Sequence, residues 1–440
     1  MKRILFYTTF SLLISIAGQA QFQKQVKQLA YADSARLVTI FKDLHANPEL
    51  AFLESRTAGI IANEFKALGY DVQTGIAQTG VLAILKNGNG PVVLYRADMD
   101  CNAVEESTTL DYASKKRMKN AAGTEVPVMH ACGHDAHITW MLGVARIMTE
   151  MKSQWKGTLM FVAQPAEEVG AGAKAMLKDG FYDKGIPTPD YLFGMHTIPL
   201  AVGKIDNAVG VRMAGTDQIN VTFKGIGGHG ASPEFTKDPI VMASNAVLQY
   251  QTIVSRNIGA QEVAVLTVGA FQAGNSNNVI PASANLKLNL RWFNDATRNT
   301  LINGIQKINE GIAVANNLPE DLFPTFEVAA TAIPLNNNET ITKRLNSTFE
   351  KLLGKENVLT NRPAFMPSED FQYFALPNTK TIYNYTFVGI ASKKAVAKAN
   401  ATGKEFPFFN HNGNFEVDLS AIPLGTEIGV TAVIELLKSK

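Results

Sequence analysis

Two hydrophobic patterns alternate along the first half of the chain. Segments with an apolar residue every three or four positions, typical of amphipathic helices, lie between short continuous apolar runs, typical of buried strands. Ser55 is expected to cap the second of these helices. The alternation predicts an α/β sheet with helices on both faces. The predicted helices are residues 32–44, 55–68, 138–151 and 171–177, and the predicted strands are 91–95, 158–163 and 191–194.

The pattern changes at about Gly215. The following segments read strand, helix, strand, strand, helix and strand, which is the order of a ferredoxin-like unit. Helix and strand patterns resume after Thr331, so this α+β unit is expected as an insertion at residues 215–330. Residues 21–214 and 331–440 would then form the main α/β domain. The predicted elements of the insertion are 218–224, 239–256, 262–271, 284–292, 296–315 and 325–329.

The N-terminus carries a different signal. Lys2 and Arg3 precede an apolar run from Ile4 to Ala17, and Gly18-Gln19-Ala20 follows it. This order is typical of a secretory signal peptide, here residues 1–20. The mature protein is therefore expected to be exported, to the periplasm in a cell that has one. An uncleaved membrane anchor is the alternative.

The composition is that of an ordinary globular protein, with 46% hydrophobic and 18% charged residues. A net charge of +2 gives no indication of nucleic-acid or membrane-surface binding. Two cysteines in an exported chain of 440 residues do not make a disulfide scaffold. Cys101 and Cys132 could pair, but a buried Cys101 and a metal-bound Cys132 fit the pattern better.

Polar clusters follow three predicted strands at their carboxyl ends. These clusters are residues 96–100, 164–168 and 195–196. Ligand sites in open α/β sheets lie beyond the carboxyl ends of the strands, so the pattern predicts one shared crevice.

Residues 128–137 hold three of the seven histidines and one of the two cysteines. Gly133 permits a turn that lets Cys132 and His134 face one point. Sulfur and imidazole nitrogen are typical ligands of zinc and its neighbours. The alternative is a loop at the start of a helix, with buried polar residues and no metal.

Further motifs complete an ordered series, and together they resemble the amidohydrolase branch of the dinuclear metallopeptidases. This group includes hippurate hydrolases, N-acyl-amino-acid deacylases and auxin-conjugate hydrolases. The resemblance covers residues 37–437 and implies a mixed-sheet catalytic domain with an inserted domain for dimerisation and for closing over substrate. The motifs lie at residues 45–50, 96–100, 129–135, 164–168, 194–196, 227–233, 278–281, 368–371 and 411.

The resemblance implies two divalent metal ions per subunit. Cys132 would bridge them, with His134 and Glu168 on one ion and His196 and His411 on the other. A thiolate between two cations screens their repulsion, and such a pair can activate water. Zinc, manganese, cobalt and nickel all suit these ligands.

The resemblance also implies roles for residues beside the metals. Glu167 would be the general base, and Asp100 would orient a ligating histidine. His229 of a neighbouring subunit would donate to the developing oxyanion, and Asn278 would make a second contact across the homodimer. Arg291 is the candidate for a substrate carboxylate, with a solvated strand arginine as the alternative. His45, His130 and His137 are assigned to packing or to supporting the ligands.

The expected function is an exported amidohydrolase that cleaves N-acyl or N-aroyl amino acids or short dipeptides. Cys101-Asn102-Ala103 and Pro367 depart from the family pattern, which puts the substrate and the activity of this member in question. The alternatives are a serine or cysteine hydrolase, an inert or binding-only sibling of the family, and a periplasmic solute-binding protein. The chain has no Gly-x-Ser-x-Gly motif after a strand.

Overall fold

The computed structural model describes residues 21–183 and 185–438, so the predicted signal peptide lies outside the described residues. These residues divide into two compact units. The smaller unit is Val211–Asn336 together with Pro363–Glu369, and the larger unit contains the rest. The insertion predicted from the sequence was 215–330, with residues 363–369 in the main domain.

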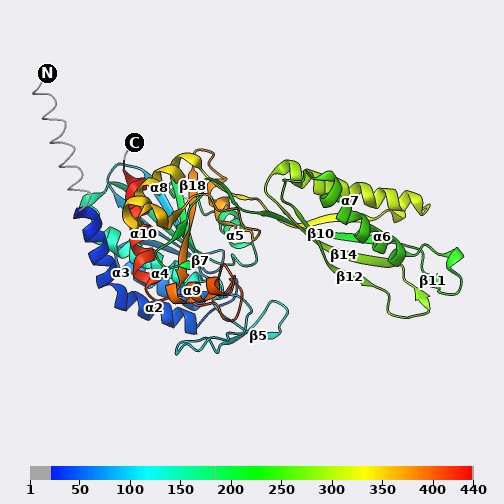
Figure 1. Cartoon of the computed structure of the whole chain (residues 1–440), viewed down its shortest axis with the longest axis horizontal. Coiled ribbons are helices and arrows are strands. Elements are labelled where there is room, and N and C mark those ends of the chain that lie inside the picture. Colours follow the sequence, from blue (N-terminus) through cyan, green and yellow to red (C-terminus); the bar gives the residue numbers. More distant parts are fainter. Residues whose placement is uncertain (1–20, 184, 439–440) are drawn as a thin grey trace, which may run out of the picture. The chain divides into compact units, whose positions relative to one another are not determined.

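A mixed eight-stranded sheet forms the centre of the larger unit (Figure 1), in the order β1-β2-β6-β3-β7-β18-β8-β17. The inner pairs β6–β3, β3–β7 and β7–β18 are parallel, whereas β1–β2 and β2–β6 are antiparallel. The mixed sheet confirms the predicted fold class. Its strands are β1 (Asp71–Ile76), β2 (Gly80–Asn87), β3 (Val92–Asp98), β6 (Gly157–Gln164), β7 (Tyr191–Ala201), β8 (Ile205–Asp206), β17 (Val358–Leu359) and β18 (Ile382–Ala391).

Helix α4 (His134–Glu150) is buried along nearly its whole length. It packs on β3, β6 and β7 and against α2 and α10. The contact with α10 is close, since a Cβ at Gly425 would lie 2.3 Å from the Trp140 ring. The helix that carries the predicted ligand His134 is therefore fixed from several sides. Residues 21–32 are also helical, and further helices of this unit are α2 (Ser34–Ala46), α3 (Ser55–Ala67), α5 (Gly172–Lys178), α8 (Glu339–Leu353), α9 (Lys393–Ala401) and α10 (Ala421–Leu437).

The start of α3 differs from the prediction that Ser55 caps it. Glu54 occupies the N-cap position, and no side chain at that position caps the helix. Glu49 accepts hydrogen bonds from the backbone N–H groups of Arg56 (3.3 Å) and Thr57 (2.9 Å) instead. A carboxylate satisfies exposed N–H groups at a helix start as well as a hydroxyl does.

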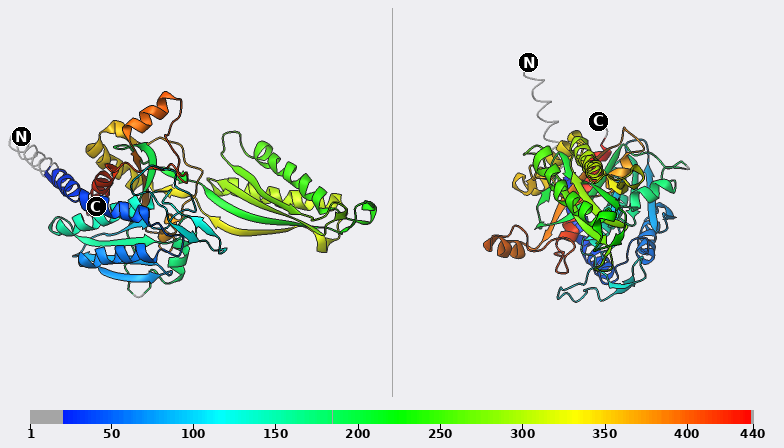
Figure 2. Two further views of the ribbon diagram at one scale, coloured as in Figure 1. Left: turned by 90° about the horizontal axis from the view of Figure 1, so that it is seen from below. Right: turned by 90° about the vertical axis from the view of Figure 1, so that its right-hand side faces the viewer.

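The smaller unit is a four-stranded antiparallel sheet in the order β12-β14-β10-β15. Helices α6 and α7 pack together on one face (Figure 2). Residues of β10 and β14 alternate between buried and more exposed, as expected for a sheet covered on one face. This is the predicted ferredoxin-like unit. Its main elements are β10 (Gly215–Lys224), α6 (Pro239–Thr252), β12 (Val265–Ala273), β14 (Ser283–Trp292), α7 (Asp295–Ala315) and β15 (Thr325–Ala332).

The described residues also form three short two-stranded ribbons. The ribbons are β4 (Arg117–Lys119) with β5 (Glu125–Pro127), β9 (Gly210–Met213) with β16 (Leu335–Asn337), and β11 (Gly228–His229) with β13 (Val279–Ile280).

Within residues 21–438, apart from residue 184, no helix is both long and apolar enough to cross a membrane.

Candidate metal centre

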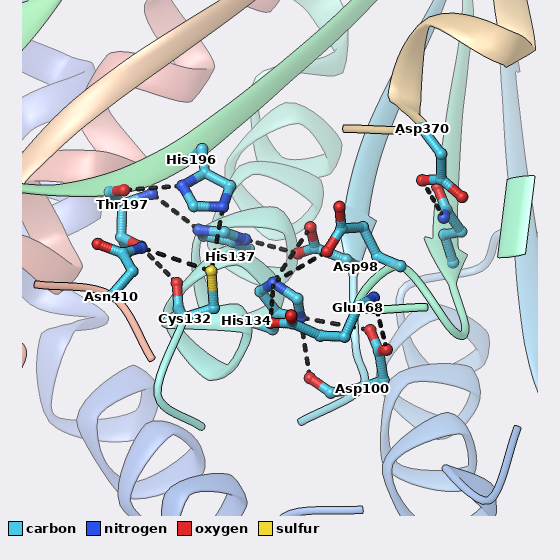
Figure 3. A network of polar contacts seen from close by, with 12 residues as sticks. Asp98, Asp100, Cys132, His134, His137, Glu168, His196, Thr197, Asp370 and Asn410 are labelled. Carbon is cyan, nitrogen blue, oxygen red and sulfur yellow. Dashed lines mark hydrogen bonds and ion pairs between the residues drawn. The ribbon is translucent and has the colours of Figure 1, made fainter. Parts of the chain in front are cut away.

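The polar clusters predicted at the strand ends meet in the larger unit (Figure 3). Strand β3 leads to Asp98 and Asp100, and His196 lies within β7. The loop after β6 carries Glu168, and the start of α4 supplies His134. Parallel strands end at one edge of a sheet, which explains why segments far apart in sequence converge.

Gly133 makes the turn that the sequence predicted. Its φ is +81°, a left-handed conformation that glycine adopts without strain. A Cβ at this position would lie 2.7 Å from side-chain atoms of Thr197, so the space is closed as well. The turn places Cys132 and His134 on the same side of the backbone, at the N-terminus of α4.

All five predicted ligands lie in this cluster. The Sγ of Cys132 is 3.5 Å from Nε2 of His196. One oxygen of Glu168 is 3.7 Å from Nε2 of His134, and its other oxygen is 3.3 Å from Nε2 of His411. His411 has a φ of +64° and is the most exposed of the five, at 53% of its side chain.

The hydrogen bonds of the histidines set which nitrogen can bind a metal. His134 donates from Nδ1 to the carbonyl oxygen of Asp100 at 2.8 Å, and His196 donates from Nδ1 to the carbonyl oxygen of Thr197 at 2.7 Å. With the proton on Nδ1, the lone pair of a neutral imidazole lies on Nε2. Ligating histidines commonly donate their other N–H to a carbonyl or a carboxylate in this way.

Two buried atoms identify the place for a cation. Nε2 of His134 and Oε1 of Glu168 have no hydrogen-bond partner, although both are shielded from water. Leaving buried polar atoms unpaired is costly, and these two point to the same space. The Cys132 sulfur groups with Glu168 and His411, and His134 groups with both glutamates. Nitrogen, oxygen and sulfur donors thus meet around Glu168, which fits divalent transition metals.

The electrostatics of the cluster also favour cations. Burial disfavours the Cys132 thiolate, but the neighbouring His196, His134 and His411 outweigh burial and hold the cysteine pKa well below its usual range. Hydrogen bonds to Cys132 and Glu168 raise the pKa of His411 to about 10. The anionic groups thus attract positive charge, and a proton on imidazole or a divalent cation satisfies the same demand.

Glu167 and Asp100 lie beside the ligands. The carboxylate of Glu167 is 3.9 Å from Nε2 of His134. One oxygen of Asp100 accepts a hydrogen bond from the Glu168 N–H at 3.0 Å, while its other oxygen lies 3.4 Å from Nδ1 of His134. Asp100 therefore contacts both predicted ligands. The main-chain carbonyl of Asp100, rather than its carboxylate, accepts the hydrogen bond that orients His134.

The remaining predicted residues belong to the smaller unit. His229 lies on β11 and Asn278 directly precedes β13, and both are exposed. The Asn278 carbonyl accepts a hydrogen bond from the Gly230 N–H at 2.9 Å. Nδ1 of His229 accepts from Ala231 N–H at 3.1 Å, which leaves the proton on the exposed Nε2. Arg291 donates to Ser368 Oγ at 2.8 Å, so part of its guanidinium holds this unit together.

A chain of contacts lies behind the predicted ligands. His137, which was expected to pack or to support the ligands, lies 2.5 Å from Asp98 through Nδ1 and accepts from the Thr197 N–H through Nε2 at 2.8 Å. Asn410, which no sequence pattern singled out, donates to the Cys132 sulfur at 3.4 Å. The position of His137 three residues after His134, on the same helix face, agrees with a supporting role.

Arg96 lies beneath this chain and is 1% exposed. It donates to Asp98 at 2.7 Å, to Asp370 at 3.2 Å, and to the side-chain oxygen of Gln164 at 2.8 Å. The guanidinium thus compensates two buried carboxylates, one of which supports His137.

Together, the two-unit fold and this donor set define a metallohydrolase of the dinuclear type. The sequence profile of peptidase family M20/M25/M40 matches residues 94–405. The chain belongs to this family, which confirms the resemblance and the assignment as an amide-hydrolysing enzyme.

Individual relatives agree with the family. Hippurate hydrolase of Campylobacter jejuni is 37% identical over 367 residues, covering 81% of this chain and 91% of the relative. IAA-amino acid hydrolase ILR1-like 5 of Arabidopsis thaliana is 32% identical over 401 residues, and the match covers 89% of this chain and 84% of the relative. The solved YXEP protein of Bacillus subtilis, described as a dinuclear metal binding M20 peptidase, is 27% identical with a TM-score of 0.74, covering 92% and 99%.

Proposed function

We propose that the chain hydrolyses the amide bond of N-acyl or N-aroyl amino acids, or of short dipeptides, with two divalent metal ions in its centre. One observation carries the proposal. The adjacent carboxylates of Glu167 and Glu168 lie 3.9 and 3.7 Å from the same buried His134 nitrogen. One can bind metal while the other handles protons. The names of the relatives, a hippurate hydrolase and an IAA-amino acid hydrolase, support this substrate class.

The side chains divide the work. When bound, the metal ions would polarise the substrate carbonyl and lower the pKa of water. Cys132, His134, Glu168, His196 and His411 would hold them. A carboxylate oxygen of Glu167 accepts the proton of the attacking water and returns it to the leaving amine.

Substituting each glutamate by glutamine distinguishes the proposed general base, Glu167, from the proposed metal ligand, Glu168. Glu167→Gln is expected to lower kcat by about 10²- to 10⁴-fold, the usual contribution of a general base, with metal content unchanged. Glu168→Gln, the matched control, is expected to lose metal. The assay is hydrolysis of a panel of benzoyl, acetyl and indoleacetyl amino acids, followed by mass spectrometry, with metal analysis of each variant. Full activity of the metal-loaded Glu167→Gln enzyme would refute the role of the base.

The alternatives predict different outcomes. A binding-only sibling or a solute-binding protein would bind these compounds without cleaving them, with or without Glu167. A serine or cysteine hydrolase would keep its activity in a chelator. The metal-dependent enzyme should lose activity in a chelator but resist a thiol alkylator while the metal protects Cys132.

We further propose a homodimer in which His229 and Asn278 complete the site of the partner. Exposed apolar residues support a protein interface on the smaller unit, with Val241 at 61% and Leu248 at 73% on α6 and Phe271 at 40% on the edge strand β12. Exposed apolar side chains that form one contiguous patch commonly mark interfaces.

Subunit mixing tests the shared site. Glu167→Gln and His229→Ala homodimers should each be nearly inactive. After subunit exchange, mixed dimers carry one intact site, so activity should return to at most about one quarter of wild type. No recovery in confirmed mixed dimers would place His229 in the site of its own subunit or outside any site.

Export of the mature chain is also proposed, from the charged and apolar pattern of residues 1–20. Cell fractionation with N-terminal sequencing should find the chain outside the cytoplasm, beginning near residue 21. A cytoplasmic chain that still begins at residue 1 would contradict export.

A further inference from the structure

A buried carboxylate outside the metal centre is bonded to the loop that carries Glu167 and Glu168. Glu54, just before α3, is 0% exposed. Its Oε1 accepts hydrogen bonds from the backbone N–H groups of Ala166 and Phe52, both at 2.9 Å. Its Oε2 accepts from the Thr79 hydroxyl at 2.6 Å. One side chain thus links the start of α3, the β1–β2 turn and the loop after β6.

The two backbone partners of Oε1 share an unusual conformation. Ala166 has a φ of +52° and Phe52 a φ of +61°. The left-handed region is unfavourable for a residue that carries a Cβ, so surrounding contacts must hold it. At Ala166 this conformation immediately precedes Glu167 and determines the direction in which both glutamates leave the strand.

The rest of the turn is closed by its own backbone. The carbonyl of Ala166 accepts from the N–H groups of Ala171 at 3.2 Å and Gly172 at 3.0 Å, and the carbonyl of Glu167 accepts from Gly170 at 2.6 Å. The Ala166 N–H instead bonds to Glu54, a residue 112 positions earlier in the chain.

We propose that Glu54 is a positioning residue that holds the left-handed turn at Ala166 and thereby aims Glu167 and Glu168 at the metal centre. The inference rests on the proposed function for the roles of those two glutamates. Glu54 would act through its bond to the Ala166 N–H rather than on metal or substrate.

The contact does not depend on charge. Burial raises the pKa of Glu54 to about 7, and the nearby Asp100 acts in the same direction. A protonated carboxyl or a glutamine amide keeps one oxygen to accept from Ala166 and Phe52, and either can pair its N–H or O–H with the Thr79 oxygen. Glu54→Gln is therefore the conservative variant that should preserve the turn.

The experiment compares three variants of the full-length, metal-loaded enzyme. Glu54→Ala removes the acceptor and should lower kcat on the order of 10²-fold, the effect of a displacement of about 1 Å, with little change in KM. Glu54→Gln should restore kcat to near wild type. Thr79→Val removes the bond to the other oxygen and serves as the matched control, with kcat near wild type.

Metal release into a chelator gives a second readout. Glu168 lies on the same turn, so Glu54→Ala should weaken metal binding about 10- to 100-fold. Losing a residue that holds a metal ligand in place commonly has an effect of this size. If wild type cleaves no N-acyl amino acid, the proposed function fails, while metal release still tests the turn. Because Glu54→Ala can prevent folding, Glu54→Asp, which withdraws the carboxylate by one methylene, should show the same losses in weaker form.

Three results would overturn the inference. The first is wild-type kcat and metal release in folded Glu54→Ala or Glu54→Asp. The second is a kcat loss in Glu54→Gln as large as in Glu54→Ala. The third is an equal loss in Thr79→Val, which would assign the effect to general packing around Glu54.

Discussion

Replacing His45 should remove a pH dependence of stability that the contacts of this residue create. His45, on α2, is 1% exposed. Its Nδ1 lies 2.6 Å from Asp135 at the start of α4, and its Nε2 lies 3.3 Å from Glu106 in the loop after β3. Both ring nitrogens face carboxylates, so both must carry protons and the imidazole is a cation.

The magnitude follows from the pKa. Burial lowers the pKa of His45, but the hydrogen bonds and charges of Asp135 and Glu106 outweigh burial and raise it from 6.5 to about 9. A folded-state pKa above the unfolded value stabilises fully below pH 6.5, and the stabilisation is lost as the pH rises through 9. At about 1.4 kcal/mol per pKa unit, the loss is about 3 kcal/mol.

Urea unfolding of wild type and His45→Gln at pH 6.5 and at pH 9, with equal metal loading, measures the contribution of His45 to the free energy of unfolding. Glutamine keeps polarity without titrating, so changes at the metal centre appear in both proteins and cancel in the difference. The free energy of unfolding of wild type should fall about 3 kcal/mol further than that of the variant. Equal slopes for the two proteins would show that His45 does not carry the charge.

Two further substitutions test the support of the metal centre. Arg96→Met leaves the buried carboxylates of Asp98 and Asp370 without their cation, so the free energy of unfolding in urea should fall by about 3–5 kcal/mol. A decrease below about 1 kcal/mol would contradict the ion-pair assignment. Gly133→Ala forces a Cβ into a left-handed turn that is already filled, so metal content and stability should both fall. Gly59→Ala, on an open helix surface, is its control and should stabilise slightly.

Hydrophobic periodicity predicted strands β3 and β6 to within three residues, but it did not predict the apolar strand β2. The predicted boundaries were also wrong where polar side chains are buried. Helix α4 begins at His134, four residues before the predicted start at Ile138, because His134, Asp135 and His137 face the interior as polar groups. Periodicity counts such residues as surface. Strand β7 runs on to Ala201, seven residues past the predicted end, for the same reason, since His196 and Thr197 are buried within it.

Cys132, His134 and Glu168 stand in local patterns that indicate chemistry, whereas the assignment of all five metal ligands, His196 and His411 included, came from the family resemblance. A cysteine and a histidine around a glycine, or two adjacent glutamates after a strand, indicate chemistry before any contact is known. Glu54 carries no such pattern, and the partners of His45, Glu54 and Arg96 include residues that lie 68 to 112 positions away along the chain. Only the fold decides which partner each of them meets.

These side chains nevertheless share a property that sequence does contain. Each is a titratable residue beside an apolar segment that is predicted to be buried, and a buried charge is costly unless it is paired. Such a residue must therefore find donors or acceptors of matching kind in the fold. For Glu54 these donors are the hydroxyl of Thr79 and the backbone N–H groups of Phe52 and Ala166, two residues with positive φ. Because the bonds that pair the carboxylate also hold the turn, Glu54→Ala should lower stability and weaken metal binding together.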